Sequence, residues 1–202
     1  MMRLSEVLTK REGVIYVVSA PSGAGKTTLI RKLLAIYPEI RLIVSYTTRG
    51  RRAGELSGRD YHFVTEEKFT AIRSRGGFAE WAHVHGSFYG TPRLALDQNI
   101  RRGRDVLLDI DVQGARKIKR QYPRAVSIFI LPPSWRELAR RLALRGTDRQ
   151  ASIRRRLDNA RREILQLMRY DYVVINREVR EALKSLGAIV IAERHRVSRI
   201  RG

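Results

Sequence analysis

The 202-residue sequence contains no cysteine, which excludes disulfide bonds, thiolate metal sites and cysteine nucleophiles. It also lacks any run of about 18 consecutive apolar residues, and its first residues lack the apolar segment of a secretory signal. We therefore expect a cytoplasmic protein with no membrane partner. With 43% hydrophobic residues, the chain has enough apolar side chains for the core of one domain, with or without a modest insertion.

Acidic residues are scarce, since 20 Asp and Glu face 41 Lys and Arg and the formal net charge is +21. Lysine is scarce too, at seven of the 41 basic residues, so arginine carries most of the positive charge. The planar guanidinium fork suits phosphate, which favours an anionic ligand such as a nucleotide or a nucleic acid. An ordinary solvated surface is the alternative for most of these arginines. The charge by itself therefore does not decide the function.

Apolar, β-branched runs alternate with helical patterns along the chain. We expect buried strands at residues 14–19, 42–46, 106–111, 126–131 and 172–176. We expect helices at residues 26–37, near 115–120, and at 134–145, 150–168 and 178–196. This alternation predicts an α/β fold with a mainly parallel sheet flanked by helices.

The region from residue 47 to residue 91 departs from this alternation. Residues 47–60 are rich in glycine and charge, which indicates irregular backbone, and residues 61–64 and 78–84 suit a small antiparallel sheet. We therefore expect a small inserted lobe, mixed and β-rich, over residues 47–91 and a helical lid over residues 134–168. The predicted domain spans residues 14–194, with its core at 14–46, 92–133 and 169–194, and with tails at 1–13 and 195–202.

The segment Ala20-Pro-Ser-Gly-Ala-Gly-Lys-Thr27 lies between an expected strand and an expected helix. It meets the pattern G-x-x-x-x-G-K-[ST] at its end, whereas Ala20 replaces the first glycine. In such a loop the backbone N–H groups converge on phosphate oxygens, Lys26 reaches the β- and γ-phosphates, and the Thr27 hydroxyl can bind magnesium. The sequence therefore predicts an ATP site. Its expected residues are Ser22, Gly23, Ala24, Gly25, Lys26, Thr27 and Thr28.

Five further motifs follow in order. They are Ser45-Tyr-Thr-Thr-Arg-Gly-Arg-Arg-Ala-Gly-Glu55, Gly58-Arg-Asp-Tyr61-His-Phe-Val, Glu80-Trp81, Tyr89-Gly-Thr91 and Asp109-Ile-Asp-Val-Gln-Gly114. Together with the phosphate loop, they resemble the guanylate kinase family over about residues 14–194. The resemblance implies a P-loop kinase that transfers the γ-phosphoryl group of ATP to GMP, with Mg²⁺ bridging the β- and γ-phosphates.

The resemblance also implies which residues bind GMP. The positions that match the phosphate site of the family are Arg49, Arg52, Tyr61 and Tyr89. The positions that match its guanine site are Ser45, Glu80, Thr91 and Asp111. A carboxylate suits guanine because guanine offers N1–H and N2–H as adjacent donors, whereas adenine offers neither. Without the resemblance, a solvated basic loop and an ordinary surface glutamate would explain the same residues.

Asp109 and Asp111 lie two residues apart at the expected C-terminal end of a strand, where open α/β sheets bind ligands. We expect Asp109 to orient the metal together with Thr27, and Asp111 to be the family's second acidic contact to guanine. Which aspartate has which role stays open, as does a role in capping the next helix or pairing with arginine.

Phosphoryl transfer concentrates negative charge, so catalysis requires positioning and electrostatic stabilisation and no nucleophilic side chain. We expect Lys26, Arg49 and two lid arginines, Arg145 and Arg156, to supply it. Other lid arginines stay open as alternatives, at positions 140, 141, 149, 154 and 155. Asn176 is expected to approach the adenine of ATP, with a turn-forming role as the alternative. The four histidines show no metal spacing.

Three other functions are weighed against this one. A different small P-loop kinase, such as one acting on a ribose bisphosphate, would have no reason to combine the four guanine-site residues. A guanylate-kinase-like interaction module typically loses the phosphate loop, which is intact here. Nonspecific electrostatic binding of nucleic acid would be a secondary activity. The expected partners are therefore ATP and GMP, and the protein is expected to be a monomer or a homodimer.

Overall fold

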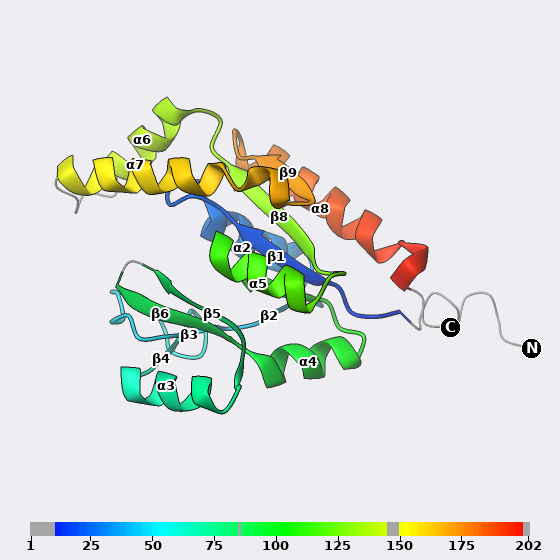
Figure 1. Ribbon diagram of the computed structural model, residues 1–202. Helices are drawn as coiled ribbons and strands as arrows, with labels where there is room; N and C mark the ends of the chain where they lie inside the picture. The colour runs from blue at the N-terminus through cyan, green and yellow to red at the C-terminus, as the bar shows by residue number, and fades with distance from the viewer. Residues whose placement is uncertain (1–10, 85, 145–149, 200–202) are drawn as a thin grey trace, which may run out of the picture.

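The computed structural model describes residues 11–84, 86–144 and 150–199 (Figure 1). Its larger sheet has five strands in the order β2-β7-β1-β8-β9, and every neighbouring pair is parallel. In that order the strands are Arg41–Leu42, Val106–Asp109, Ile15–Ser19, Val126–Leu131 and Tyr172–Ile175. The predicted α/β class with a mainly parallel sheet is confirmed.

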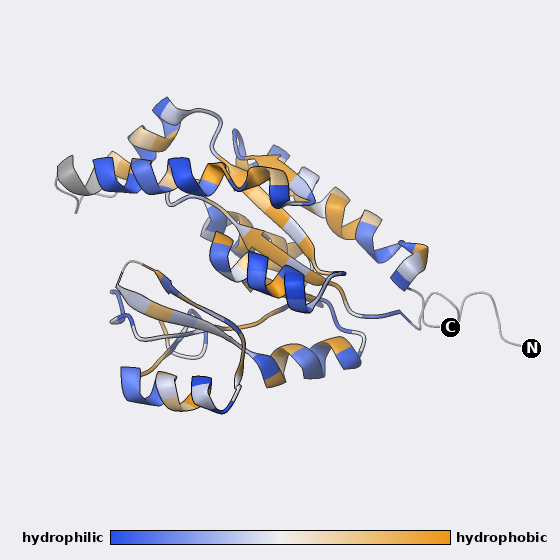
Figure 2. Cartoon of the chain, viewed as in Figure 1, coloured by the Kyte–Doolittle hydropathy of each residue, from blue (hydrophilic) through white to orange (hydrophobic). Residues whose placement is uncertain are grey.

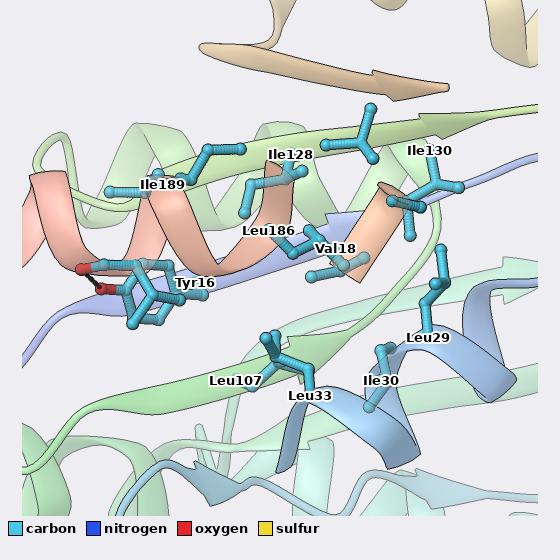
Figure 3. Packing of buried hydrophobic residues seen from close by; sticks show 14 of the residues in the cluster. Tyr16, Val18, Leu29, Ile30, Leu33, Leu107, Ile128, Ile130, Leu186 and Ile189 are labelled. Carbon is cyan, nitrogen blue, oxygen red and sulfur yellow. Dashed lines mark hydrogen bonds between the residues drawn. The ribbon is translucent and has the colours of Figure 1, made fainter. Parts of the chain in front are cut away.

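Helices cover both faces of this sheet. Helices α2 (Lys26–Ile36) and α8 (Val179–Arg194) pack on one face, and α4 (Arg93–Arg101) and α5 (Val112–Gln121) pack on the other. Alternate residues of β1 therefore enter two hydrophobic clusters. Figure 3 shows the first cluster, in which the central strands meet α2 and α8. Hydrophobic residues gather on these strands, while α5 and α7 expose many hydrophilic ones (Figure 2).

A second, mixed sheet has the strand order β4-β3-β6-β5 and lies apart from the first (Figure 1). In that order its strands are His62–Phe63, Tyr46–Thr47, Ser87–Pro92 and Phe78–Val84. Helix α3 (Glu66–Ser74) covers it through Phe69, which stacks on Phe78 and Phe88. The predicted mixed, β-rich lobe is confirmed: β5, β6 and β3 pair antiparallel, whereas β3 and β4 pair in parallel, so the sheet is not antiparallel throughout.

The predicted strand at residues 42–46 is also wrong, because the structure divides it between the two sheets. Leu42 pairs with β7, and the Ile43 N–H donates to Leu107 O at 3.0 Å, which keeps this part on the core. Tyr46 pairs with β4 and β6 instead. The chain therefore crosses from the core sheet to the small sheet at Val44 and Ser45.

Two further helices follow β8. Helix α6 (Trp135–Ala143) begins after Ser134, whose hydroxyl accepts a hydrogen bond from the Glu137 N–H, as the predicted cap requires. Helix α7 (Gln150–Ile164) packs on α6 through Ala160 and is followed by a short 3₁₀ helix, Leu167–Arg169. The expected helix over residues 178–196 is confirmed as α8.

Both ends of the described chain are joined to the core. Arg11 donates two hydrogen bonds to Asp105, at 2.6 and 2.9 Å. Arg199, in the 3₁₀ helix Val197–Arg199, is 4% exposed and pairs with Glu193 at 2.7 Å. Packed residues thus occur inside both predicted tails, and the rest of the domain division stays a prediction. Within the described ranges, every helix is too short or too polar to span a membrane.

Candidate active site

Two adjoining cavities lie where the phosphate loop, the end of β7 and the small sheet meet. The first has a volume of about 290 Å³ and the second about 620 Å³. Both cavities are lined by Thr27, Ser45, Arg52, Tyr61, Tyr89 and Asp109. The cavities therefore form one continuous cleft that joins the predicted ATP and GMP sites.

The phosphate loop is held in a conformation that only glycine adopts easily. Gly23 and Gly25 have φ of 91° and 92°, and a Cβ atom at Gly25 would lie 2.3 Å from the Asn176 amide nitrogen. The first cavity is lined by Ala20, Ser22, Gly23, Gly25, Lys26, Thr27 and Thr28. Ala24 is fully buried in the hydrophobic core instead, and its backbone N–H and carbonyl are already hydrogen-bonded to Pro21 O and the Asn176 amide. The loop leads into α2, whose N-terminal N–H groups favour an anion.

Lys26 forms an ion pair with Asp109, and its ammonium also lies 3.5 Å from the Ile110 carbonyl oxygen. Thr27 is the second residue of α2 and lines the cleft with Asp109. Their oxygens are the kind of ligand that Mg²⁺ prefers. Among residues 11–84, 86–144 and 150–199, no group of three or more His, Cys, Asp or Glu is arranged to hold a metal. The residues present therefore fit a metal whose other ligands come from nucleotide phosphates and water.

Asp111 lies beyond the end of β7, so the predicted strand at 106–111 is two residues too long. It is the N-cap of α5, and its Oδ1 accepts a hydrogen bond from the Gly114 N–H at 2.9 Å. Asp111 also lines the first cavity. Asp109 at the end of β7 and Asp111 at the N-cap of α5 therefore line the same cavity, although they do not lie on one strand as expected.

Glu80 on β5 lines the first cavity and is only 4% exposed. The Thr91 hydroxyl on the neighbouring strand β6 donates a 2.6 Å hydrogen bond to Glu80 Oε1. Burial raises the pKa of Glu80 to about 7, and the charge of Asp111 adds to the rise, while the Thr91 hydrogen bond opposes it. Thr91 is fully buried, so the structure places it behind Glu80 as its support.

The residues predicted to bind the phosphate of GMP line the same cleft. Arg52, Tyr61 and Tyr89 line both cavities, and Arg49 lines the larger one. Arg49 donates to Glu55 Oε1 at 2.8 Å, which is the main reason that the pKa of Glu55 is lowered. Burial and the nearby Asp109 raise the pKa of Tyr61, so its phenol keeps its proton at neutral pH. Glu55 was not expected at the site from the sequence.

Asn176 is 3% exposed, and its amide donates to Ala24 O at 2.7 Å. Arg141 on α6 donates to Asn176 O at 3.2 Å and to Ala24 O at 3.4 Å, and it pairs with Glu137 at 2.7 Å. These contacts place Asn176 behind the phosphate loop as a support. Its approach to adenine stays a prediction.

The lid arginines are described only in part. Arg156 lies on α7 and is half-buried. The predicted catalytic Arg145 and the alternative Arg149 lie outside the described residues.

Sequence reasoning missed Glu163, on the last turn of α7. This side chain lines the first cavity, and its Oε2 atom is buried and accepts no hydrogen bond from any described residue. Burial is the main cause that raises the pKa of Glu163 to about 7. In the sequence it is one charged residue in an arginine-rich helical stretch, so no local signal distinguishes it.

Comparisons with known proteins agree on one family. A family model described as guanylate kinase matches residues 12–193. A guanylate kinase from Syntrophotalea carbinolica is 53% identical over 192 residues, which cover 95% of this chain and 91% of the relative. One from Geobacter metallireducens is 49% identical, with 95% and 94% covered. The crystal structure of guanylate kinase from Anaplasma phagocytophilum superposes with a TM-score of 0.81 at 40% identity, covering 96% of this chain and 92% of that one.

Proposed function

The chain belongs to the guanylate kinase family and phosphorylates GMP with ATP, and we propose how its own residues divide this reaction. The observation that carries the proposal is the buried carboxylate of Glu80, fixed by Thr91 in a cavity that also contains the phosphate loop. A single cleft then brings the acceptor base and the donor phosphates together.

Glu80 reads guanine as an acceptor for N1–H and N2–H. The two donors are adjacent on one edge of the base, and a carboxylate presents two oxygens to them. Ser45 and Asp111 line the same cavity and complete the contacts to the base, while Thr91 acts on the base through Glu80. AMP offers no donor at N1, so it would leave a buried carboxylate without a partner, and such a loss discriminates strongly.

Arg49, Arg52, Tyr61 and Tyr89 hold the phosphate of GMP. Glu55 fixes this cluster before GMP binds, because it accepts from the Arg49 side chain and from the Arg52 N–H, both at 2.8 Å. Two guanidinium groups and two phenol hydroxyls then supply donors to the phosphate oxygens. Prior ordering of this kind lowers the entropy cost of binding.

ATP binds through the loop that ends at Thr28, with the loop N–H groups and the α2 N-terminus on its phosphates. The Lys26 ammonium reaches the β- and γ-phosphates and stabilises the charge that develops between donor and acceptor. Arg49, and Arg156 and Arg145 from the lid, add positive charge to the same region. Asn176 keeps the loop in its conformation, and a contact with adenine is the further part of its proposed role.

A magnesium ion fits the oxygen ligands of Thr27 and Asp109, the latter through water. When bound, it would neutralise charge on the β- and γ-phosphates. The ion pair between Lys26 and Asp109 keeps both charges at the place where nucleotide phosphates enter. The remaining steps of the proposal depend on this chain's own donors and carboxylates.

Composition and family likeness support three further parts of the proposal, which concern location, oligomeric state and a secondary activity. We place the enzyme in the cytoplasm, and we expect a monomer or a homodimer. We also expect weak, salt-sensitive binding of nucleic acid as a secondary activity. Binding of nucleic acid is favoured by four exposed arginines, which form no ion pair with any described residue. They are Arg116, Arg120, Arg162 and Arg169.

A coupled assay of ADP release tests the proposed acceptor. With ATP fixed, GMP should be phosphorylated far better than AMP, UMP or dTMP. Equal rates with AMP and GMP would refute the guanine assignment of Glu80. Failure with every monophosphate would favour an interaction module over an enzyme.

A further inference from the structure

Glu163 belongs to the lid, yet its side chain lines the cavity of the acceptor base. It lies on the last turn of α7, which packs on α6 through Ala160 and Leu157. In Figure 1 this helix lies in the upper part of the molecule, while the mixed sheet that carries Glu80 lies in the lower part. Glu163 therefore connects the lid with a cavity whose other walls come from the core and the GMP lobe.

Three carboxylates from three parts of the fold line this one cavity. Glu80 comes from β5, Asp111 from the N-cap of α5, and Glu163 from α7. The charge of Asp111 raises the pKa of both glutamates, so Asp111 is the neighbour that the two share. Asp111 therefore repels each of the two glutamates until hydrogen-bond donors enter between them.

Two of these carboxylates already have donors within the protein. Glu80 accepts from the Thr91 hydroxyl, and Asp111 accepts from the Gly114 N–H. Glu163 differs, because its Oε2 is buried and accepts no hydrogen bond from any described residue. Buried oxygens of this kind are nearly always paired in the working state of a protein. A donor for Glu163 is therefore expected to arrive with a ligand.

The amino group of guanine is a donor of the right kind. Its nitrogen carries two hydrogens, and Glu80 uses the one beside N1–H. The second hydrogen points away from Glu80, towards a different acceptor. Lys26 is a less suitable donor, because Asp109 and the Ile110 carbonyl already hold its ammonium.

We propose that Glu163, together with Asp111, accepts a hydrogen bond from the exocyclic amino group of GMP and so determines specificity for the 2-amino group. This inference deepens the proposed function, since it depends on Glu80 binding the same base. The amino nitrogen then lies between one carboxylate fixed on the core and one carried by the lid.

Calorimetric titration with GMP and with IMP, in the absence of ATP, tests this inference. IMP keeps N1–H and O6 but lacks the 2-amino group, so it isolates the proposed contact. In the unaltered protein GMP should bind tighter than IMP. Glu163→Ala should weaken GMP binding by about tenfold or more, and Glu163→Gln by less, because an amide oxygen still accepts. The affinity for IMP should stay within about twofold in both variants.

Asp158→Asn is the matched control, because Asp158 lies on the same helix with its side chain 59% exposed. It should leave binding of both nucleotides unchanged. Equal weakening of GMP and IMP in the Glu163 variants would overturn the inference, since Glu163 would then act on the lid or on Lys26. Unchanged GMP binding would overturn it as well. If the unaltered protein binds AMP as tightly as GMP, the proposed role of Glu80 in binding guanine is refuted. That outcome differs from the two outcomes that refute the role of Glu163 alone.

Discussion

Replacing Thr91 with valine removes one hydrogen bond from Glu80 and nearly keeps the shape of the side chain. The lost donor is the hydroxyl that lies 2.6 Å from Glu80 Oε1. Thr91 is fully buried and Glu80 is 4% exposed, so water has little room to replace it. A hydrogen bond to a charged group contributes about 1.5–3 kcal/mol, which corresponds to about 10- to 150-fold in an equilibrium constant. The ionised form of Glu80, which guanine requires, loses this stabilisation.

The expected result at pH 8 is a KM for GMP that rises about tenfold or more, while the KM for ATP stays unchanged. The pH dependence of kcat/KM for GMP should change as well, because it reports the free enzyme. With the pKa of Glu80 at about 7, kcat/KM should fall as the pH drops below that value. Thr91→Val raises this pKa further, so the fall in kcat/KM should begin about 1–2 pH units higher in the variant. The phosphate of GMP titrates equally with both enzymes and cancels in the comparison.

Thr70→Val provides the control for Thr91→Val, since Thr70 is exposed on α3 in the same lobe. Its steady-state kinetics and pH profile should match those of the unaltered enzyme. If Thr91→Val leaves the KM for GMP within about twofold and does not move the pH profile, Glu80 does not bind the base as an ionised acceptor.

Three other predictions follow from contacts at the same cleft. Lys26→Ala should lower kcat by about a hundredfold or more with unchanged circular dichroism, and near-normal turnover would defeat the mechanism. Glu80→Gln should raise the KM for GMP and also stabilise the empty protein. Because the folded pKa of about 7 lies above the ordinary 4.5, ionisation of Glu80 disfavours the fold as the pH rises through this window, by up to about 3 kcal/mol above pH 7. Urea unfolding at pH 8 measures this gain, and a loss of stability would contradict the burial argument. Gly25→Ala should weaken ATP binding in calorimetry, because its Cβ would meet the Asn176 amide at 2.3 Å, and parental affinity would show that the loop tolerates the change.

The parts of the fold that could be predicted from the sequence are those with local causes. The buried strand at residues 126–131 is a short, mainly apolar run in which Val126, Ile128 and Ile130 are β-branched, and Ser134 caps the next helix through a residue three positions away. The run at residues 42–46 looks like the same kind of strand. Its two halves pair with different sheets, and those partners, Leu107 and Gly90, lie far away in the sequence. Periodicity does not contain that information, so the prediction failed there.

The predicted site residues divide in a similar way. The phosphate loop is contiguous, and its geometry agrees with the motif because the glycines and the helix start are local. The acceptor site depends on residues from distant segments, and only the family resemblance brought them together in the sequence analysis. Even so, the resemblance gave Thr91 a direct role at the base, whereas the structure places it behind Glu80. Glu163 had no signal because its burial is created by packing between α7 and the core.

The net charge of +21 and the buried acids have separate effects on nucleotides. A strongly basic surface attracts ATP, GMP and AMP alike, because its field acts on phosphate charge and is screened over about 8–10 Å in physiological salt. It can therefore speed encounter but cannot tell guanine from adenine. Discrimination needs groups that contact the base at short range and are costly to leave unpaired. Glu80 and Glu163 fit that requirement, because burial raises the pKa of each to about 7 and both side chains line the first cavity. On the proposed function, Glu80 and Glu163, rather than the basic surface, therefore carry the selectivity for GMP.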